Sequence, residues 1–351
     1  QNFTVHEENP TQIPDGNIKM KWIMISGCDS GFGAIMVEKI KAMKDVGVFA
    51  GCFLQGTVDR LDAEQRDDVK PVRLDVTCED SVKSCAEYIA SELGSNQGLY
   101  GLVNNAGILI NPGPTEWTPL RAYRQMFDVN VIGTVALTKY CLPLIRKSQG
   151  RIVNVASIAG RSGLPSEPAY CASKYAVEGY SDVLRRDMAP WGVTVHIIEP
   201  GVFPNTGLYD KFQSGLDTLW NDLAPELKEE YGEEYYQHFR EKIGKSLTVM
   251  PNTDSSMVPE AMLDALFSPA PKYRYRVGND SKYLITLLNM CHESTQDWLY
   301  GRGHNKTGGS PVTAPKDGYN SATSRYGTDW SRPILMLLLS FVGYKAIRPR
   351  L

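Results

Sequence analysis

The stretch KWIMISGCDSGFGAIMVEKI, residues Lys21–Ile40, joins a short apolar run to a turn with three glycines and then to an amphipathic segment. A short apolar run that ends in a glycine turn is typical of a buried parallel strand. The apolar residues from Phe32 to Met43 recur at helical spacing. The stretch therefore predicts a strand, a tight turn and a helix, which is the first unit of a parallel α/β sheet.

The same unit repeats along the chain as far as Gly201. Further strand-like runs occupy residues 48–54, 71–76, 99–107, 150–157 and 192–201. Helical stretches lie between them, most clearly at Leu120–Lys147 and Pro168–Met188. Strands that alternate with helices indicate a parallel sheet with helices on both faces, because crossovers between parallel strands are right-handed. We therefore predict a single-domain α/β fold with a doubly wound sheet of the Rossmann type.

Composition divides the rest of the chain. Residues 1–20 are expected to be a lead-in, and the domain is expected to span residues 21–300. Within the domain, residues 202–250 are rich in aromatic and charged side chains, which predicts one or two helices on an excursion from the sheet. Residues 271–278, PKYRYRVG, are expected to form a last edge strand. Residues 301–351 are predicted to be a flexible tail that ends in a short apolar segment.

The overall composition is that of an ordinary globular protein, with 42% hydrophobic residues, 22% charged residues and a formal net charge of −3. There is no basic stripe, so nucleic acid is not expected as a partner. The seven cysteines include no CxxC pair, which argues against a zinc site and a dense disulfide framework. We expect no metal.

No apolar run approaches the ~20 residues that a membrane-spanning helix needs. The nearest is ILMLLLSFVGY, Ile334–Tyr344, which is short enough to be a docked or interfacial helix. It is followed by Lys345, Arg348 and Arg350, and basic residues beside an apolar segment would suit an anionic membrane surface. Membrane association is therefore left open.

The glycine turn is a candidate for binding phosphate groups. Gly27, Gly31 and Gly33 come directly after a strand and open a helix. Glycines let the backbone approach a pyrophosphate closely, and a helix N-terminus supplies free N–H groups and positive potential. A tight turn with no ligand is the alternative, since the G-xxx-G-x-G spacing differs from the G-x-G-xx-G fingerprint.

Two further strand ends carry groups that would face the same crevice. Asp75 and Val76 follow the third strand, where the Asp75 carboxylate can accept from an adenine amino group or cap the next helix. Asn104 ends the fourth strand, and because a buried amide must find partners, we expect it to clamp neighbouring strands. The backbone around Ala106 and Gly107 is expected to line a cofactor.

Polar side chains that are scattered in the sequence converge in such a sheet, because ligands lie beyond the carboxyl ends of its strands. Ser157 ends the fifth strand, and Tyr170 and Lys174 lie one helical turn apart on the next helix. Asn130 lies in an otherwise apolar helix, and Pro200-Gly201 ends the sixth strand. Each alone can be a turn residue, a surface charge or a helix kink. Because all five features are expected at one crevice, an active site is the favoured interpretation.

Together these motifs resemble the short-chain dehydrogenase/reductase superfamily over about residues 21–277. The resemblance rests on Gly27-xxx-Gly31-x-Gly33, Asn104-Asn-Ala-Gly107, Asn130, Ser157, Tyr170-xxx-Lys174 and Pro200-Gly201. Segments such as GCDSGFG and YCASKYAVEGYSDVLRR look like the branch of retinol and hydroxysteroid dehydrogenases. That branch implies a small lipophilic alcohol or ketone as substrate, with the excursion at residues 202–250 as an apolar lid.

The resemblance and the chemistry of alcohol oxidation give each residue a role. Tyr170 would be the acid/base that takes the hydroxyl proton, which requires its ordinary pKa of about 10 to be lowered. The ammonium of Lys174 would favour the phenolate, and Ser157 would stabilise charge on the substrate oxygen. By resemblance, Asn130 holds a water that orients Lys174.

NAD is the expected cofactor, and NADP is the alternative. The end of the second strand, GCFLQGT, is neutral, whereas an NADP enzyme would need a basic residue there, and the Asp29 carboxylate would repel a 2′-phosphate. Asn205 stands where the branch usually has a threonine, so Asn205 and Thr206 are both weak candidates for contacting the nicotinamide. The expected cofactor contacts are Gly27, Cys28, Asp29, Ser30, Gly31, Phe32, Gly33, Asp75, Val76, Asn104, Ala106, Gly107, Tyr170, Lys174, Pro200, Gly201, Val202 and Thr206.

Two alternatives and two further expectations remain. The chain could instead be an NADPH-preferring carbonyl reductase of the same fold, or a dinucleotide-binding protein that has lost turnover. A homodimer is expected. Association with the endoplasmic reticulum membrane is implied by the resemblance, with a soluble cytoplasmic protein as the alternative.

Overall fold

The computed structural model describes residues 20–110, 112–208, 212–246, 252–297, 300 and 311–314. Its centre is a seven-stranded sheet in which every adjacent pair of strands is parallel. The spatial order is β3-β2-β1-β4-β5-β6-β7, so the order reverses between β1 and β4. The strands are β1 (Lys21–Ser26), β2 (Val46–Cys52), β3 (Val69–Arg73), β4 (Gly101–Asn104), β5 (Arg151–Val155), β6 (Thr194–Pro200) and β7 (Arg274–Val277). This is the doubly wound sheet predicted from the sequence.

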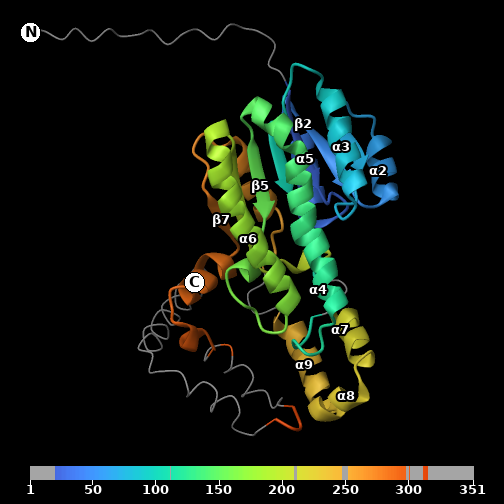
Figure 1. Cartoon of the computed structure of the whole chain (residues 1–351), viewed down its shortest axis with the longest axis vertical. Coiled ribbons are helices and arrows are strands. Elements are labelled where there is room, and N and C mark those ends of the chain that lie inside the picture. Colours follow the sequence, from blue (N-terminus) through green and yellow to red (C-terminus); the bar gives the residue numbers. More distant parts are fainter. Residues whose placement is uncertain are drawn as a thin grey trace, which may run out of the picture.

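Helices connect the strands and cover both faces of the sheet (Figure 1). The α-helices are α1 (Gly31–Lys41), α2 (Gln55–Asp62), α3 (Glu79–Leu93), α4 (Leu120–Phe127), α5 (Gly133–Ser148), α6 (Pro168–Met188), α7 (Phe212–Asn221), α8 (Pro225–Tyr231), α9 (Glu233–Ser246), α10 (Met257–Phe267) and α11 (Thr286–Leu288). The shorter or irregular turns are η1 (Asp128–Ile132), η2 (Ile158–Gly160), η3 (Ala189–Trp191), η4 (Pro204–Thr206) and η5 (Asp280–Ile285).

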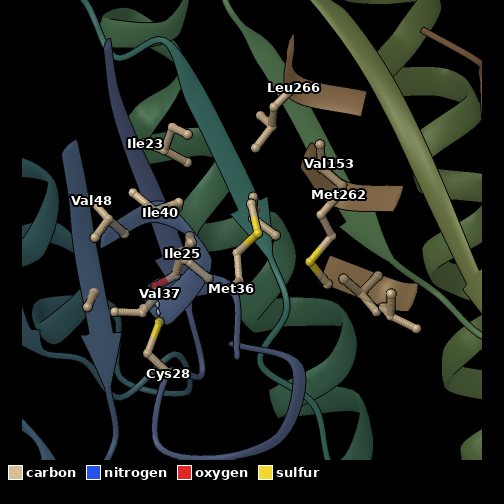
Figure 2. Packing of buried hydrophobic residues seen from close by; sticks show 14 of the residues in the cluster. Ile23, Ile25, Cys28, Met36, Val37, Ile40, Val48, Val153, Met262 and Leu266 are labelled. Carbon is tan, nitrogen blue, oxygen red and sulfur yellow. Dashed lines mark hydrogen bonds between the residues drawn. The ribbon is translucent and has the colours of Figure 1, made fainter. Parts of the chain in front are cut away.

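The core forms on both sides of the sheet because successive side chains of a strand point to opposite faces. On β1, Ile23 and Ile25 join the cluster packed by α1 and α10, whereas Met24 joins the cluster packed by α3 and α5. Figure 2 shows the first cluster, in which Met36 of α1 and Met262 of α10 converge on the strands. Burial on both faces explains why these strands read as continuous apolar runs.

The long helix expected at Leu120–Lys147 is a helical stretch at Leu120–Ser148. It consists of α4, the π-helical turn η1 and α5, which follow one another without a gap. Among the described residues it is also the one helix long and apolar enough to cross a membrane. Its apolar residues Leu137, Cys141 and Ile145 are buried in the core beside α3. Packing inside the domain therefore accounts for its apolar character.

The excursion after β6 is larger than the sequence suggested. Instead of one or two helices, it contains the three helices α7, α8 and α9, which project together at one end of the molecule (Figure 1). Residues 271–278 do supply the last edge strand, as β7. Of the predicted tail, residues 311–314 are described, and there the Val312 N–H donates to the Tyr231 carbonyl at 3.3 Å. The lead-in at residues 1–19 and the apolar segment Ile334–Tyr344 lie outside the described residues.

Candidate active site

A cavity of about 890 Å³ lies at the carboxyl ends of the central strands, where the strand order reverses. Such a crevice is where doubly wound sheets bind their ligands. Its walls come from the glycine turn after β1, the segments after β3 and β4, the end of β5, α6 and the loop after β6. Of the expected site residues, it is lined by Gly27, Asp29, Ser30, Gly31, Phe32, Asp75, Val76, Ala106, Gly107, Ser157, Tyr170, Lys174, Pro200, Gly201 and Thr206.

At its three glycine positions, Gly27, Gly31 and Gly33, the turn after β1 has no room for a larger side chain or has a backbone conformation that disfavours one. Gly27 and Gly31 have φ values of +72° and +57°, a left-handed conformation that favours glycine. A Cβ on Gly33 would lie 2.2 Å from the Gly27 carbonyl oxygen, and one on Gly31 would lie 2.6 Å from the Thr206 carbonyl oxygen. The turn therefore presents bare backbone to the cavity, directly before the first turn of α1.

Asp29 ties this turn to the neighbouring strand. Its two carboxylate oxygens accept hydrogen bonds from the backbone N–H groups of Phe53 and Leu54, at 2.7 and 2.8 Å. Phe53 also lines the cavity, and the Arg73 guanidinium lies 4.8 Å from the centre of its ring. A negative charge is thus held at the end of β2, at the edge of the cavity.

The two asparagines at the end of β4, Asn104 and Asn105, make different hydrogen bonds. Asn104 donates to Thr138 Oγ1 at 2.9 Å and to Asn154 Oδ1 on β5 at 2.8 Å, which confirms the predicted clamp between strands. Asn105, which sequence reasoning did not single out, donates to the carbonyl oxygens of Ser26 and Gly27 at 3.0 and 3.1 Å. The second asparagine of NNAG was the available signal, because a half-buried amide after a strand also needs partners.

Tyr170 is buried on the first turn of α6, opposite the end of β5. Burial raises the pKa of its phenol well above the ordinary value, a hydrogen bond with Ser157 lowers that pKa, and the nearby Glu167 and Cys171 raise it further. Ser157 caps η2, where its Oγ accepts from the Ala159 N–H at 3.1 Å. The serine hydroxyl and the phenol are thus adjacent at the cavity wall.

Lys174 lies one turn beyond Tyr170, with its ammonium 5.7 Å from the centre of the Tyr170 ring. Its Nζ donates to the Val155 carbonyl oxygen at 2.9 Å. Burial lowers the pKa of Lys174 from 10.5 to about 8. Burial thus raises the phenol pKa overall, and the expected lowering of that pKa by the Lys174 ammonium stays a prediction.

Asn130 lies in the π-helical turn η1 and is fully enclosed. Its Oδ1 accepts from the Ile108 N–H at 2.8 Å, and its Nδ2 donates to the Ile108 carbonyl and to Ser173 Oγ, each at 3.0 Å. A Cβ on Gly107 would lie 3.3 Å from Asn130 Oδ1 and 3.5 Å from Lys174 Nζ. Asn130 and Lys174 therefore converge behind Gly107, and the water expected between them stays a prediction.

Several expected contacts lie behind the cavity wall. The residues that do not line the cavity are Cys28, Gly33, Asn104, Asn130 and Val202. The Cys28 thiol, for example, turns into the core and donates to the Ile25 carbonyl. Thr206 lies at the wall and donates to the Phe203 carbonyl at 2.9 Å, whereas Asn205 is exposed.

The cavity also has a wall that sequence reasoning missed. Beyond Phe53 and Asn105, it is lined by Leu74, Thr77, Ile108, Leu109, Ile110, Arg121, Arg124, Gln125, Asp128, Val129, Val155 and Ala156. Many of these come from α4 and the loop before it, which lack a motif of their own. Phe203, Gly207 and Leu208 also line the cavity, and they belong to the excursion at residues 202–250 that was expected to be an apolar lid. Among the described residues, no group of three or more histidine, cysteine or acidic side chains is placed to hold a metal ion.

The chain is similar to known proteins over most of its length. Residues 21–216 match the family model described as short chain dehydrogenase. The chain is 38% identical over 268 residues to retinol dehydrogenase 7 of Rattus norvegicus, covering 76% of this chain and 83% of that protein. It is 39% identical over 288 residues to a 3beta-hydroxysteroid dehydrogenase of Caenorhabditis elegans, covering 80% and 74%. Among solved structures, a short-chain dehydrogenase from Streptomyces avermitilis superposes with a TM-score of 0.63 at 25% identity, covering 82% of this chain and 99% of that one.

Proposed function

The chain belongs to the short-chain dehydrogenase family and is an oxidoreductase, and from that premise we propose that it interconverts a lipophilic alcohol and its carbonyl compound with NAD. The observation that carries this proposal is the placement of Ser157, Tyr170 and Lys174 on the wall of the same cavity as the glycine turn. A hydride acceptor bound in this cavity and a proton acceptor at the phenol are the two requirements of alcohol oxidation.

The cavity fits a dinucleotide. The bare backbone of Gly27 and Gly31 leaves room for a pyrophosphate, and the N–H groups of the first turn of α1 carry the positive end of the helix dipole. Asp75 and Val76 would hold the adenine end, and Pro200, Gly201 and Thr206 would hold the nicotinamide end. When bound, the nicotinamide takes up or releases the hydride.

The residues of the chain supply the proton transfer. Tyr170 takes the proton of the substrate hydroxyl during oxidation and returns it during reduction. Ser157 donates to the substrate oxygen and stabilises the charge that develops there. Because burial raises the phenol pKa, positive charge is needed nearby for oxidation at neutral pH, and the Lys174 ammonium provides it from one turn away.

The preference for NAD rests on Asp29. Its carboxylate is held at the end of β2 by two backbone N–H groups, so it cannot rotate away from the ribose of a bound dinucleotide. A 2′-phosphate placed there would be repelled by this charge. Arg73, which pairs with Cys52 at this strand end, has its guanidinium 4.8 Å from the centre of the Phe53 ring.

The lipophilic substrate is supported by the apolar wall and by the relatives. Leu109, Ile110, Phe203 and Leu208 line the cavity, and all of these except Phe203 pack in one cluster with Tyr170. Helices α7 and α9 extend this surface, since their apolar residues pack in one cluster with Tyr170 and Leu109. The two relatives named above are a retinol dehydrogenase and a hydroxysteroid dehydrogenase, whose names specify lipophilic alcohols.

A steady-state screen of retinol and of 3α-, 3β- and 17β-hydroxysteroids, each with NAD and NADP, tests this proposal. We expect turnover of at least one of these substrates, with higher kcat/KM for NAD. An equal or higher kcat/KM with NADP would replace the NAD assignment by an NADPH-preferring reductase. Dinucleotide binding without turnover of any substrate would instead favour a binding protein.

A further inference from the structure

Both backbone polar groups of Val202 are held by buried side chains from later parts of the chain. The Val202 N–H donates to Asp280 Oδ2 at 2.7 Å. The Val202 carbonyl accepts from Asn252 Nδ2 at 3.0 Å and from the Asn252 N–H at 3.3 Å. Asn252 Nδ2 also donates to Asp280 Oδ1 at 2.8 Å, so the two side chains are joined to each other. We call Asn252 and Asp280 the Val202 clamp.

The clamp is buried and fits closely against the loop after β6. Asp280 is 6% exposed and Asn252 is 7% exposed. A Cβ on Gly201 would lie 1.8 Å from Asp280 Oδ1, and a Cβ on Gly278 would lie 2.5 Å from Asn252 Nδ2. Two glycines thus make room for two buried polar side chains. Because a buried carboxylate costs free energy unless donors satisfy it, the Val202 N–H is held in one direction.

The residues on either side of Val202 line the cavity, whereas Val202 and the clamp lie behind its wall. Gly201 and Phe203 both belong to that wall. The peptide groups of the described residues are all trans, and a planar trans peptide has its N–H and its C=O pointing in opposite directions. Since the Val202 N–H points to Asp280, the Gly201 carbonyl of the same peptide group points away from Asp280. For the same reason the Phe203 N–H points away from Asn252, which holds the Val202 carbonyl.

The two peptide groups that point away from the clamp can bind a ligand. In the described part of the chain, neither the Gly201 carbonyl nor the Phe203 N–H makes a hydrogen bond. They offer one acceptor and one donor on two residues that line the cavity. Nicotinamide carries a carboxamide, which has a carbonyl as acceptor and an NH₂ group as donor. The loop therefore complements the nicotinamide half of a dinucleotide.

From this arrangement we propose that Asn252 and Asp280 are positioning residues for the nicotinamide half of the dinucleotide. The inference rests on the proposed function, because it requires a dinucleotide with its nicotinamide at the loop after β6. By holding two successive peptide groups, the clamp sets the direction of the Gly201 carbonyl and the Phe203 N–H before the ligand arrives. Groups that are already ordered bind a ligand without the cost of being ordered by it.

The clamp acts on one half of the dinucleotide. Within the described residues, its side chains form hydrogen bonds with Val202, with each other and with the N–H groups of Asn279 and Ser281. None of these bonds reaches the glycine turn or the segment after β3, which would hold the pyrophosphate and the adenine end. Loss of the clamp should therefore weaken binding of the nicotinamide half selectively.

Calorimetric titration of the full chain with NADH and with ADP-ribose, which lacks nicotinamide, tests the proposal. The Asp280 carboxylate accepts from three N–H groups, whereas the amide of Asp280→Asn has one acceptor oxygen and leaves a donor facing its NH₂ group. In this variant the affinity for NADH should fall by about tenfold, the effect of losing one hydrogen bond, while that for ADP-ribose stays within about twofold. Asn252→Ala, which removes the side-chain donor to the Val202 carbonyl, should show the same selective loss.

Ser281→Ala is the matched structural control. Ser281 is 1% exposed and lies next to Asp280, and its Oγ donates to the Glu199 carbonyl at 2.8 Å without bonding to Val202. This variant should lower the free energy of unfolding in urea and leave the ratio of the two affinities unchanged. Asp187→Asn, at an exposed position of α6, repeats the acid-to-amide change away from the clamp and should leave both affinities unchanged.

Each other outcome has a defined meaning. Equal losses of NADH and ADP-ribose affinity in both clamp variants, or no loss in either variant, would overturn the positioning role and leave the proposed function standing. A selective loss of NADH affinity in Ser281→Ala would also overturn it, because any damage to this turn would then suffice. If the parent protein binds neither NADH nor ADP-ribose, the proposed function is wrong, and the positioning role with it.

Discussion

Lys174 Nζ lies 5.7 Å from the centre of the Tyr170 ring and donates its hydrogen bond to the Val155 carbonyl, 2.9 Å away on β5. The lysine is therefore anchored to the sheet, and in the proposed function it acts on the phenol through its charge. Burial disfavours the charged form of both side chains, raising the pKa of Tyr170 and lowering that of Lys174. A further positive charge in the cavity would lower the pKa of the phenol and favour the phenolate.

The first prediction concerns Tyr170→Phe, which removes the phenolic oxygen and keeps the ring. We expect kcat/KM for alcohol oxidation to fall by about 10²–10⁴, the range for loss of a general acid/base. Dinucleotide affinity, measured by fluorescence titration, should stay within a few-fold of the parent value. Tyr175→Phe, an exposed tyrosine on the same helix, is the control and should keep full activity. Equal turnover by Tyr170→Phe would show that another group transfers the proton.

The second prediction concerns the pH dependence of stability in Lys174→Met. The pKa of Lys174 is about 8 in the folded protein and 10.5 for an unperturbed lysine, as in the unfolded chain, so the unfolded state binds more protons between these pH values. The buried ammonium therefore lowers the unfolding free energy of the parent protein to its full extent below pH 8, and this destabilisation disappears above pH 10.5.

The variant has no ammonium at this position and is not destabilised in this way. Its unfolding free energy relative to that of the parent should therefore be greatest near neutral pH. We expect the difference in unfolding free energy between variant and parent to shrink by about 1–2 kcal/mol from pH 7 to pH 9.5. Urea unfolding at both pH values measures it. A difference that does not change with pH would mean that Lys174 is not desolvated.

The third prediction concerns Glu167, which precedes α6 and raises the pKa of Tyr170 by its negative charge. Burial raises the pKa of Glu167 itself to about 7, so the carboxylate forms as the pH rises through that value. In Glu167→Gln the rising limb of kcat/KM for oxidation should move to lower pH, because the phenol ionises more readily. Glu226→Gln, on the exposed side of α8, should leave the profile unchanged. A shift to higher pH would contradict the electrostatic role.

The fourth prediction concerns cofactor choice in Asp29→Asn. The amide oxygen can still accept a hydrogen bond from the N–H of Phe53 or of Leu54, while the negative charge is lost. We expect the ratio of kcat/KM for NADP to that for NAD to rise by about tenfold, the effect of removing roughly 1.4 kcal/mol of repulsion. Parallel assays with both dinucleotides give this ratio, with Asp187→Asn as control. An unchanged ratio would show that Asp29 is only a structural link between the turn and β2.

Much of the fold could be predicted because local patterns and tertiary structure agree. The helix predicted at Pro168–Met188 has those bounds in the structure, since a proline suits the first helical position and the apolar spacing continues behind it. The order of strands and helices followed from their alternation, and the sheet confirms it.

The excursion after β6 was less predictable. Helices α7–α9 owe their burial to partners far away in the sequence, such as Trp117, whose ring packs against Trp220 and Tyr235. Periodicity in a segment rich in aromatic and charged residues does not show which of its faces will be covered. The number of helices was therefore underestimated.

The sequence by itself determined the sheet and the residues that meet at its carboxyl edge, because strand alternation, glycine turns and the spacing of Tyr170 and Lys174 are local properties of the chain. The tertiary structure decided how these groups are charged and what holds them. Burial set the direction of both pKa shifts, and packing joined Asp280 to Val202 across 78 positions. Desolvation and long-range hydrogen bonds depend on neighbours that only folding assembles, so no local pattern encodes them.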